Sequence, residues 1–217
     1  MVGEYEPTPR TVPTRHSDRM SYDRALVHAV LDEALFCHVS FVSAGVPMIL
    51  PTLYVRVGDR VYLHTSTGSR LAGLAAGGGL AVSLAVTLVD GLVLARSAFH
   101  HSMNYRSVVA HGVTVVVADA DERLASLAAL LDHVASGRSV DCRPPSAKEL
   151  AATAVLRLPL REVSAKVRSG GPMDDAADEA LPHWAGVLPL AVTAGPPQPV
   201  PGAGPAPTYL QGYGRAG

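Results

Sequence analysis

The stretch Ala95–Gly112 places many hydrogen-bonding side chains between apolar runs of strand type. Each polar group that is buried without a partner costs about 1–3 kcal/mol, so these groups must meet water, one another or a ligand. Arg96 and Arg106 are suited to clamp a phosphate or carboxylate. The neighbouring polar side chains could bond a ribityl chain or a ring edge: Ser102, Asn104, Tyr105 and Ser107. The stretch therefore indicates a phosphate-bearing cofactor; the alternative is a solvated strand face with Arg106 in a surface ion pair.

A second candidate site follows the strand that ends near His64. Hydroxyl side chains and a glycine follow this strand and lead into a predicted helix whose first turn contains Arg70. Of these hydroxyl residues we assign Thr65, Ser66 and Ser69 to the cofactor. Backbone N–H groups at the start of a helix favour an anion, and an arginine adds a charge-assisted contact. The alternative is an ordinary Ser/Thr helix cap beside an exposed arginine. Because sites gather at strand ends, His64 is the one histidine that we expect to act in catalysis.

Other chemistries lack their motifs. The chain has no GxSxG, HExxH or Walker sequence, which argues against a hydrolase of those types or a nucleoside triphosphatase. His100 and His101 are adjacent on a strand and point to opposite faces, so they form no metal site by themselves. We predict no metal ligands in this chain.

Composition narrows the class of protein further. The 217 residues are 48% hydrophobic and carry a net charge of −1, without a Lys/Arg-rich run, which argues against nucleic-acid binding. Cys37 and Cys142 form no close pair and fit buried or inert thiols in a reducing compartment. Residues 1–18 are polar and lack the apolar core of a signal peptide. A cytoplasmic location is the expectation.

The uncharged stretch Leu71–Val89 is long enough to cross a bilayer. Three glycines, Gly77–Gly79, interrupt it, and the pattern changes there from helical spacing to alternation of bulky and small residues. We therefore interpret it as a short helix followed by a strand, with no membrane partner.

The remaining elements position these sites. Helices are predicted from Ser21, over Ser69–Ala76, after Asp119 with Glu122 as a capping box, and near Ser146–Ala154. Strands are predicted over Phe36–Ser43, Met48–Arg56 (with an edge or bulge at Pro51), Arg60–Thr65, Leu80–Leu88, Leu92–Phe99, Tyr105–Ala118 and Val155–Val167. Asp90-Gly91 predicts a hairpin between the fourth and fifth of these strands.

Consecutive short strands joined by hairpins favour an antiparallel barrel with a few helices outside it, that is, a mainly β (α+β) fold. We assign residues 1–18 to a flexible N-terminal segment and 19–193 to the barrel domain. Residues 194–217 are dominated by Pro, Gly and Ala and are predicted to be a disordered tail.

Several of these segments carry a family resemblance. Arg15–Arg19 and Leu94–Val109, together with Tyr62–His64, resemble the flavin-nucleotide-binding proteins related to pyridoxamine 5′-phosphate oxidase. The Tyr105–Val108 element is among the most specific parts, and Trp184–Pro189 adds support. The nitroimidazole-reductase-like subgroup is the most similar branch.

The resemblance covers roughly residues 15–190 and implies a split β-barrel that forms a homodimer and holds FMN at the subunit interface. Ser69 and Arg70 would then meet the phosphate, and the Ser102–Ser107 element would complete the site. His64, Thr65 and Ser66 would lie nearer the ribityl chain or the isoalloxazine. No residues match the pyridoxal-phosphate-binding set of the true oxidase, so that substrate is not expected.

The function implied is that of an FMN-dependent oxidoreductase. NADH or NADPH would supply hydride to the flavin, and a small electron-poor molecule or dioxygen would be reduced. Family members differ in cofactor, with FMN, deazaflavin and haem all represented. The alternative is therefore a non-enzymatic protein that stores or senses a flavin or a haem.

Overall fold

The computed structural model describes residues 3–211 and 213–215. The chain divides into two compact units, and each is described by itself. The first unit comprises Met1–Val86 and Val108–Ala165, and the second comprises Thr87–Ser107 and Lys166–Gly217.

The first unit is built on antiparallel strands whose pairing closes on itself. The order is β6-β7-β4-β3-β2-β5, and β5 also pairs with β6. The bounds are β2 Phe36–Ser43, β3 Val46–Val57, β4 Arg60–Ser66, β5 Leu80–Leu94, β6 Ser102–Val116 and β7 Thr153–Pro159. Beyond β6 the order continues through β8 (Glu162–Arg168) to β1 (Met20–Ser21). The predicted mainly β fold of split-barrel type is confirmed.

Alternation along the strands produces the core of this unit. On β2, Cys37, Val39 and Phe41 are buried while their neighbours are not, as expected for a sheet with one covered face. Burial raises the pKa of the Cys37 thiol to about 12, so this thiol is inert, as predicted. Pro51 pairs with His38 on β2, but β4 pairs with β3 only from Tyr54 onward, so the proline lies at the expected edge.

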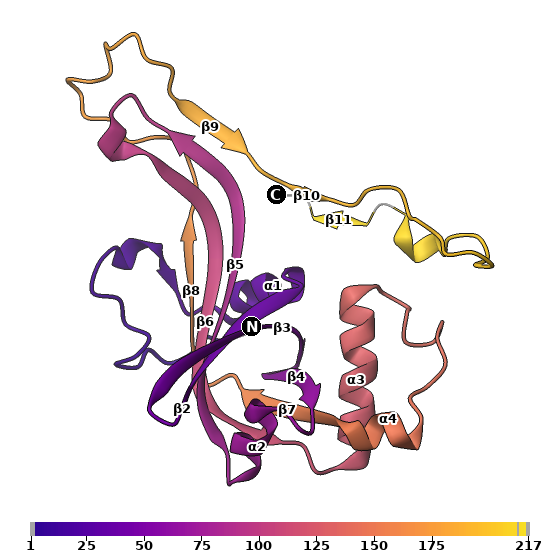
Figure 1. The fold of residues 1–217 in the computed structure, drawn as a ribbon. Coiled ribbons are helices and arrows are strands. Elements are labelled where there is room, and N and C mark those ends of the chain that lie inside the picture. The colour runs from indigo at the N-terminus through magenta and orange to yellow at the C-terminus, as the bar shows by residue number, and fades with distance from the viewer. Residues whose placement is uncertain (1–2, 212, 216–217) are drawn as a thin grey trace. The chain divides into compact units, whose positions relative to one another are not determined.

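Four α-helices lie outside these strands (Figure 1). They are α1 (Arg24–Glu33), α2 (Arg70–Ala76), α3 (Ala120–Val134) and α4 (Ala147–Ala152), and a 3₁₀ turn, η1, covers Ser17–Arg19. The first helix begins later than predicted, because the carboxylate of Asp23, rather than Ser21, accepts the hydrogen bond from Leu26 N at 2.7 Å. Among the described residues no helix has the length and apolarity that a bilayer crossing requires.

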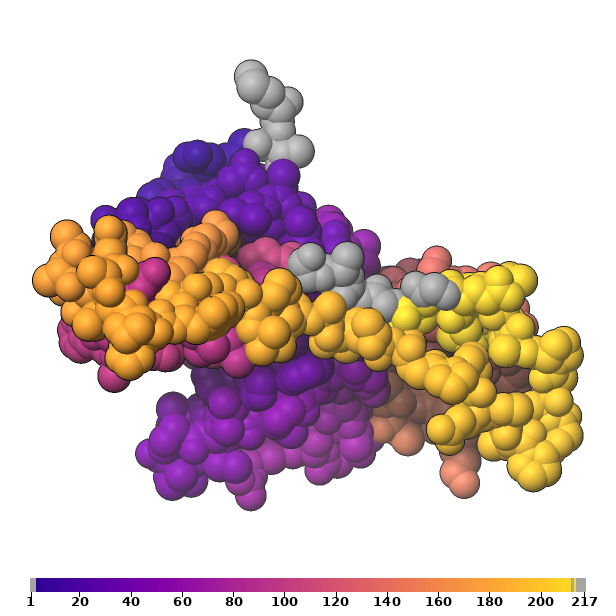
Figure 2. Space-filling view, turned by 90° about the horizontal axis from the view of Figure 1, so that it is seen from above, coloured from indigo at the N-terminus to yellow at the C-terminus, as the bar shows by residue number. Residues whose placement is uncertain are grey.

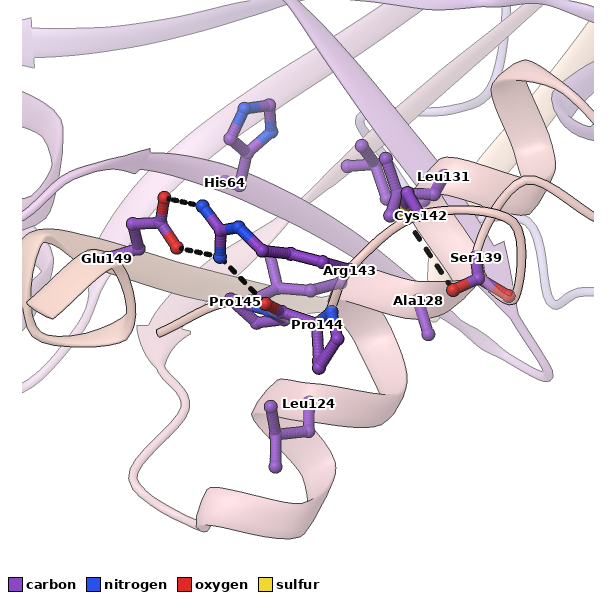
Figure 3. A pocket seen from close by; sticks show the side chains of 12 residues that line it. His64, Leu124, Ala128, Leu131, Ser139, Cys142, Arg143, Pro144, Pro145 and Glu149 are labelled. Carbon is purple, nitrogen blue, oxygen red and sulfur yellow. Dashed lines mark hydrogen bonds and ion pairs between the residues drawn. The ribbon is translucent and has the colours of Figure 1, made fainter. Parts of the chain in front are cut away.

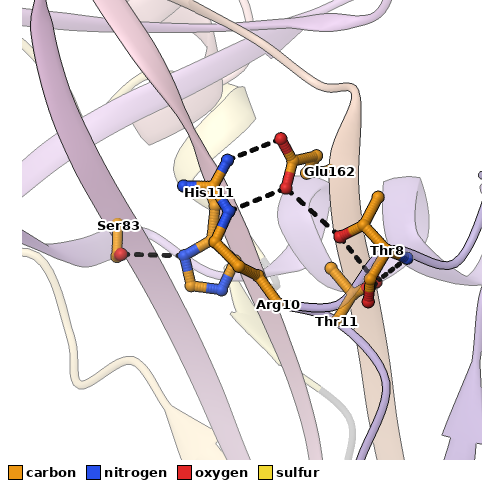
Figure 4. A network of polar contacts seen from close by, with 6 residues as sticks. All are labelled: Thr8, Arg10, Thr11, Ser83, His111 and Glu162. Atoms are coloured by element: carbon orange, nitrogen blue, oxygen red, sulfur yellow. Dashed lines mark hydrogen bonds and ion pairs between the residues drawn. The ribbon is translucent and has the colours of Figure 1, made fainter.

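Residues 3–18 contact the body of the first unit. Tyr5 is 2% exposed, and its hydroxyl bonds to His28 at 2.9 Å and to Asp59 at 3.2 Å. Burial, with Asp59 nearby, raises the pKa of Tyr5 to about 12. Arg10 makes a two-pronged ion pair with Glu162 (Figure 4). The segment is therefore anchored at two points, while the domain boundary at residue 18 stays a prediction.

The second unit contains the far halves of β5 and β6 and the C-terminal part of the chain. Here η2 (Ala98–His100) precedes β6, and β9 (Gly186–Pro189) pairs with β5 over Gly91–Leu94. The C-terminal part adds only β10 (Val192–Thr193), η3 (Thr208–Leu210) and β11 (Gly214–Arg215). Figure 2 shows this part in orange and yellow. The disorder of residues 194–217 stays a prediction.

Three strand predictions are wrong. The predicted strand Leu92–Phe99 ends with β5 at Leu94, and Phe99 lies in η2. No hairpin forms at Asp90-Gly91, because β5 continues through both residues to Leu94. A side chain at position 91 would meet Leu188 O at 3.0 Å, so this glycine serves the close approach of β9 rather than a turn. The predicted strand Val155–Val167 is divided into β7 and β8, and Leu160 N donates to Asp59 O between them.

Two glycines before β5 differ in whether the structure leaves room for a side chain, and substituting each by alanine tests this difference. Gly79 has a φ of +109°, and a Cβ there would lie 2.6 Å from Val113 Cγ1, whereas a Cβ at Gly73 in α2 meets nothing within 4 Å. We expect Gly79→Ala to lower the free energy of unfolding by about 1–3 kcal/mol. Gly73→Ala should raise it by about 0.5–1 kcal/mol. Urea unfolding followed by circular dichroism measures both, and equal effects would contradict this account.

Candidate functional site

His64 lies near the end of β4 and faces α3. Side chains alternate along the strand, so His64 shares a face with Tyr62, and Thr65 shares the opposite face with Leu63. The Tyr62 hydroxyl donates to Glu122 on α3 at 2.6 Å, which identifies the face toward the helix. His64 and Thr65, which we expected to contact the same cofactor region, therefore point in opposite directions.

An apolar cavity of about 600 Å³ lies beside His64 in the first unit (Figure 3). Its walls are mainly aliphatic side chains of α3 and two consecutive prolines of the following loop. The lining residues are His64, Leu124, Leu127, Ala128, Leu130, Leu131, Ser139, Cys142, Arg143, Pro144, Pro145 and Glu149. A large apolar cavity with few polar groups is typical of a small-molecule site.

The ring of His64 has an unmet hydrogen-bonding requirement. Its Nδ1 is buried, and no described residue provides a partner for it. A buried polar atom in that state costs about 1–3 kcal/mol, and such atoms usually indicate strain or a functional role. Within the aliphatic wall, this imidazole could coordinate a metal-centred ligand, as could the thiol of Cys142.

Two anchor points hold the loop that closes the cavity. Ser139 donates to Asp132 through both its N–H, at 2.8 Å, and its hydroxyl, at 2.7 Å. At the other end, Arg143 binds both oxygens of Glu149 at 2.6 and 2.8 Å. The hydrogen bonds from Arg143, followed by those from Ser146, lower the pKa of Glu149 to about 2. The carboxylate is therefore charged at any physiological pH.

A polar cluster fixes α3, the main wall of the cavity, to the sheet. Glu122 accepts from Tyr62 on β4 at 2.6 Å and from Arg157 on β7 at 2.9 and 3.0 Å. These contacts, the Tyr62 bond first, hold the pKa of Glu122 below its ordinary value. Asp119 caps the helix through Glu122 N, as predicted. The side chain of Glu122 is used for the sheet rather than for the reciprocal half of a capping box.

The hydroxyls of the predicted phosphate loop mainly serve the loop itself. Ser66 Oγ accepts from Gly68 N at 3.2 Å, and Ser69 Oγ caps α2 by accepting from Ala72 N at 3.0 Å. Arg70 is exposed; its guanidinium lies 3.8 Å from Met48 Sδ, and no described carboxylate pairs with it. Arg70 is thus the loop residue with a charge available to a ligand.

The other predicted arginines are in the second unit and already bind carboxylates. Arg106 contacts both oxygens of Asp90 at 2.9 and 2.7 Å. Arg96 pairs with Asp174 at 3.1 Å, and Asp174 also accepts from the backbone N–H groups of Arg96 and Ser97. The Asp174 side chain is only 3% exposed, so this pair is structural.

The remaining predicted contacts of that unit lie on β6, and two of the four are bonded locally. Asn104 holds Arg168 through its oxygen and Gly170 O through its nitrogen, and Ser107 donates to Lys166 O at 3.3 Å. Ser102 and Tyr105 lie on β6 and are partly buried. The structure thus gathers His64, Thr65, Ser66, Ser69 and Arg70 in one unit and Ser102, Asn104, Tyr105, Arg106 and Ser107 in the other.

The cavity residues from α3 and the following loop were not identified from sequence. The sequence predicted this helix from its capping residues, and two of its apolar side chains, Leu124 and Leu131, remain 42% and 38% exposed. The apolar stripe of this helix includes more side chains than the sheet covers, and this excess could have indicated a ligand. The charged pair Arg143–Glu149 gave no signal, because its residues meet only after the loop folds back.

A family model described as Pyridoxamine 5′-phosphate oxidase matches residues 23–167, which include the sheet, His64 and α3. The chain belongs to this family. Membership confirms the resemblance found in the sequence and does not by itself assign the oxidase's substrate.

Solved structures of this family extend over nearly the whole chain. The flavocytochrome Anf3 from Azotobacter vinelandii is 38% identical, with a TM-score of 0.88, and the match covers 95% of this chain and 97% of that one. An FAD- and haem-binding protein from Mycobacterium smegmatis is 36% identical, with a TM-score of 0.84, over 89% and 96%.

A putative 5-nitroimidazole antibiotic resistance protein from Bacteroides thetaiotaomicron shares the fold. It is 19% identical, with a TM-score of 0.58, over 68% of this chain and 86% of that one. No curated protein matches the chain.

The Glu122 cluster predicts an acid-dependent loss of stability. Since the folded-state pKa of Glu122 is below its ordinary value of 4.5, its contribution is present above that value. It is lost as the pH falls through the folded-state pKa. We expect urea midpoints between pH 7 and pH 3 to fall more steeply for the wild type than for Glu122→Gln. Glu179→Gln, at an exposed site, should follow the wild type, and parallel slopes for all three proteins would refute this role.

Proposed function

We propose that this protein binds a haem in the apolar cavity beside His64 and a flavin at the Thr65–Arg70 loop, and that it acts as an oxidoreductase. The observation that carries the proposal is the buried, unpartnered Nδ1 of His64 in the wall of an aliphatic cavity of about 600 Å³. Drug- and cofactor-sized ligands occupy pockets of roughly 300–1,000 Å³.

The chemistry of the cavity fits a haem. A neutral imidazole is a common axial ligand of haem iron. The leucines of α3 and the two prolines would cover the macrocycle and exclude water. Two relatives above 35% identity support the assignment, since their names describe a flavocytochrome and an FAD- and haem-binding protein.

Arg70 is the residue that we assign to the phosphate of the flavin. It is exposed, has no described carboxylate partner and follows the hydroxyl-rich end of β4. The sequence favours FMN, whereas the Mycobacterium smegmatis relative is named for FAD. Both cofactors carry the phosphate that an arginine would bind, so the assignment of Arg70 holds for either flavin.

The two groups together would supply hydride acceptance by the flavin and one-electron chemistry by the haem. We expect NADH or NADPH as the electron donor and a small electron-poor molecule or dioxygen as the acceptor. The role of the chain is to bind and orient: Arg70 neutralises phosphate, His64 holds the iron, and α3 keeps water from the macrocycle.

A homodimer is the expected assembly, through a second copy packed on β2 and β3. Four apolar side chains are exposed on one face of these strands: Phe36, Val42, Ile49 and Leu53, of which Ile49 is 66% exposed. Monomeric proteins rarely leave such a group in water. Pro47 and Pro51 remove N–H donors from this part of β3, which favours packing of side chains over addition of a strand.

The cofactor assignments are tested by spectroscopy of the purified protein. We expect a flavin band and a Soret band after reconstitution. His64→Ala should weaken haem binding by roughly tenfold or more and spare the flavin. Arg70→Ala should weaken flavin binding by roughly 10–100-fold and spare the haem. Chromatography of the released flavin identifies FMN or FAD.

Matched controls are His183→Ala, an exposed histidine before β9, and Arg161→Ala, an exposed arginine between β7 and β8. Neither should change either affinity. A wild-type protein that binds neither group would refute the proposal. Binding without reduction by NADH or NADPH would leave the storage or sensor function in its place.

The dimer is tested by placing a charge on its apolar surface. Ile49→Glu should convert the dimer to a monomer in light scattering coupled to size-exclusion chromatography, because a carboxylate cannot be buried there without a partner. Val140→Glu changes a side chain that is 88% exposed in the loop after α3 and should leave the dimer intact. A wild-type monomer would contradict the proposal.

A further inference from the structure

The cavity beside His64 has one charged edge. Among its lining residues in the described part of the chain, Arg143 is the one arginine and Glu149 the one carboxylate. Figure 3 shows the Arg143 side chain running from the loop toward Glu149, with the aliphatic walls on either side. A ligand with an apolar body and an anionic edge would match this distribution.

Glu149 and Arg143 differ in how many other hydrogen bonds each makes besides their ion pair. Glu149 also accepts from Ser146 N at 2.7 Å and from Ser146 Oγ at 2.9 Å, as part of the capping box of α4. Its charge therefore stays satisfied without Arg143. Among the residues that the structure describes, Arg143 otherwise donates only to the backbone carbonyl of Pro144, at 2.9 Å.

Solvent reaches both side chains of the pair. Arg143 is 68% exposed and Glu149 is 50% exposed. Ion pairs at such exposed positions contribute little to folding stability, so a stabilising role does not explain the bidentate geometry. The planar guanidinium presents the same two-pronged contact to any carboxylate that enters its reach.

We propose that Arg143 is the residue that recognises carboxylate groups at the mouth of the cavity, by exchanging Glu149 for a carboxylate of the ligand. For the haem of the proposed function, on which this inference rests, that carboxylate is a propionate. In the absence of ligand Glu149 holds the arginine at the mouth, and on binding Arg143 transfers its two hydrogen bonds to the ligand. Glu149 is then a competitor for the site.

The test compares hemin with hemin dimethyl ester, whose propionates are blocked. Soret titrations give the affinity of each probe for wild type, Arg143→Met, which keeps an aliphatic stem, and Glu149→Gln, which can keep the capping box. Arg138→Met is the matched control, because Arg138 pairs with Asp141 on the same loop at similar exposure and does not line the cavity.

We expect Arg143→Met to weaken hemin binding about tenfold and to leave the ester unchanged, and Glu149→Gln to strengthen hemin binding about threefold. Arg138→Met should match the wild type. If wild type binds hemin and Arg143→Met binds it equally well, or loses both probes alike, the assignment of Arg143 is overturned while the haem proposal stands. If wild type binds neither probe, both proposals fail.

Discussion

The carboxylate of Glu122 determines where α3 lies, and the cavity depends on that placement. Three side chains from three elements converge there, because Tyr62 and Arg157 both donate to Glu122. At the other end of the helix, His133 donates to Ala34 O at 2.8 Å. Between these two points the helix faces the strand that carries His64. The inner face of the helix also packs on the sheet, where Leu130 joins an apolar cluster with Val55 and Val155, so polar contacts and apolar packing together fix the helix that lines the cavity.

The alternation of β4 divides the chemistry of the chain into separate regions. His64 faces α3, while Thr65, one residue later, faces the opposite side of the sheet. One ligand beside β4 therefore does not contact both side chains directly. Arg70, beyond the end of the strand, is free of that constraint because it lies in the first turn of α2. Two candidate regions, an apolar cavity beside His64 and a charged loop at Arg70, follow from the period of a single strand.

Local signals in the sequence predicted the local structure well. Alternation identified β2 and β4 closely, and the cap at Asp119 was correct because capping depends on residues three positions apart. Ser69, which we assign to the cofactor, also caps α2. The hairpin at Asp90-Gly91 failed because distant residues determine both positions. Asp90 is held by Arg106, and Gly91 admits β9. His64 was identified as a candidate, yet its cavity required α3 and the following loop to come together in space.

The arginines of this chain differ in what they can offer a ligand. The pair Arg96–Asp174 encloses a carboxylate that is 3% exposed, so removing the arginine would leave a buried charge without its counter-ion. Arg96 is therefore poorly suited to contact a ligand, because such a contact must form and break. Arg143 shares its partner with Ser146 in open solvent, so it can leave at little cost. The burial of the carboxylate partner therefore distinguishes an arginine with a structural role from an arginine that could bind a ligand.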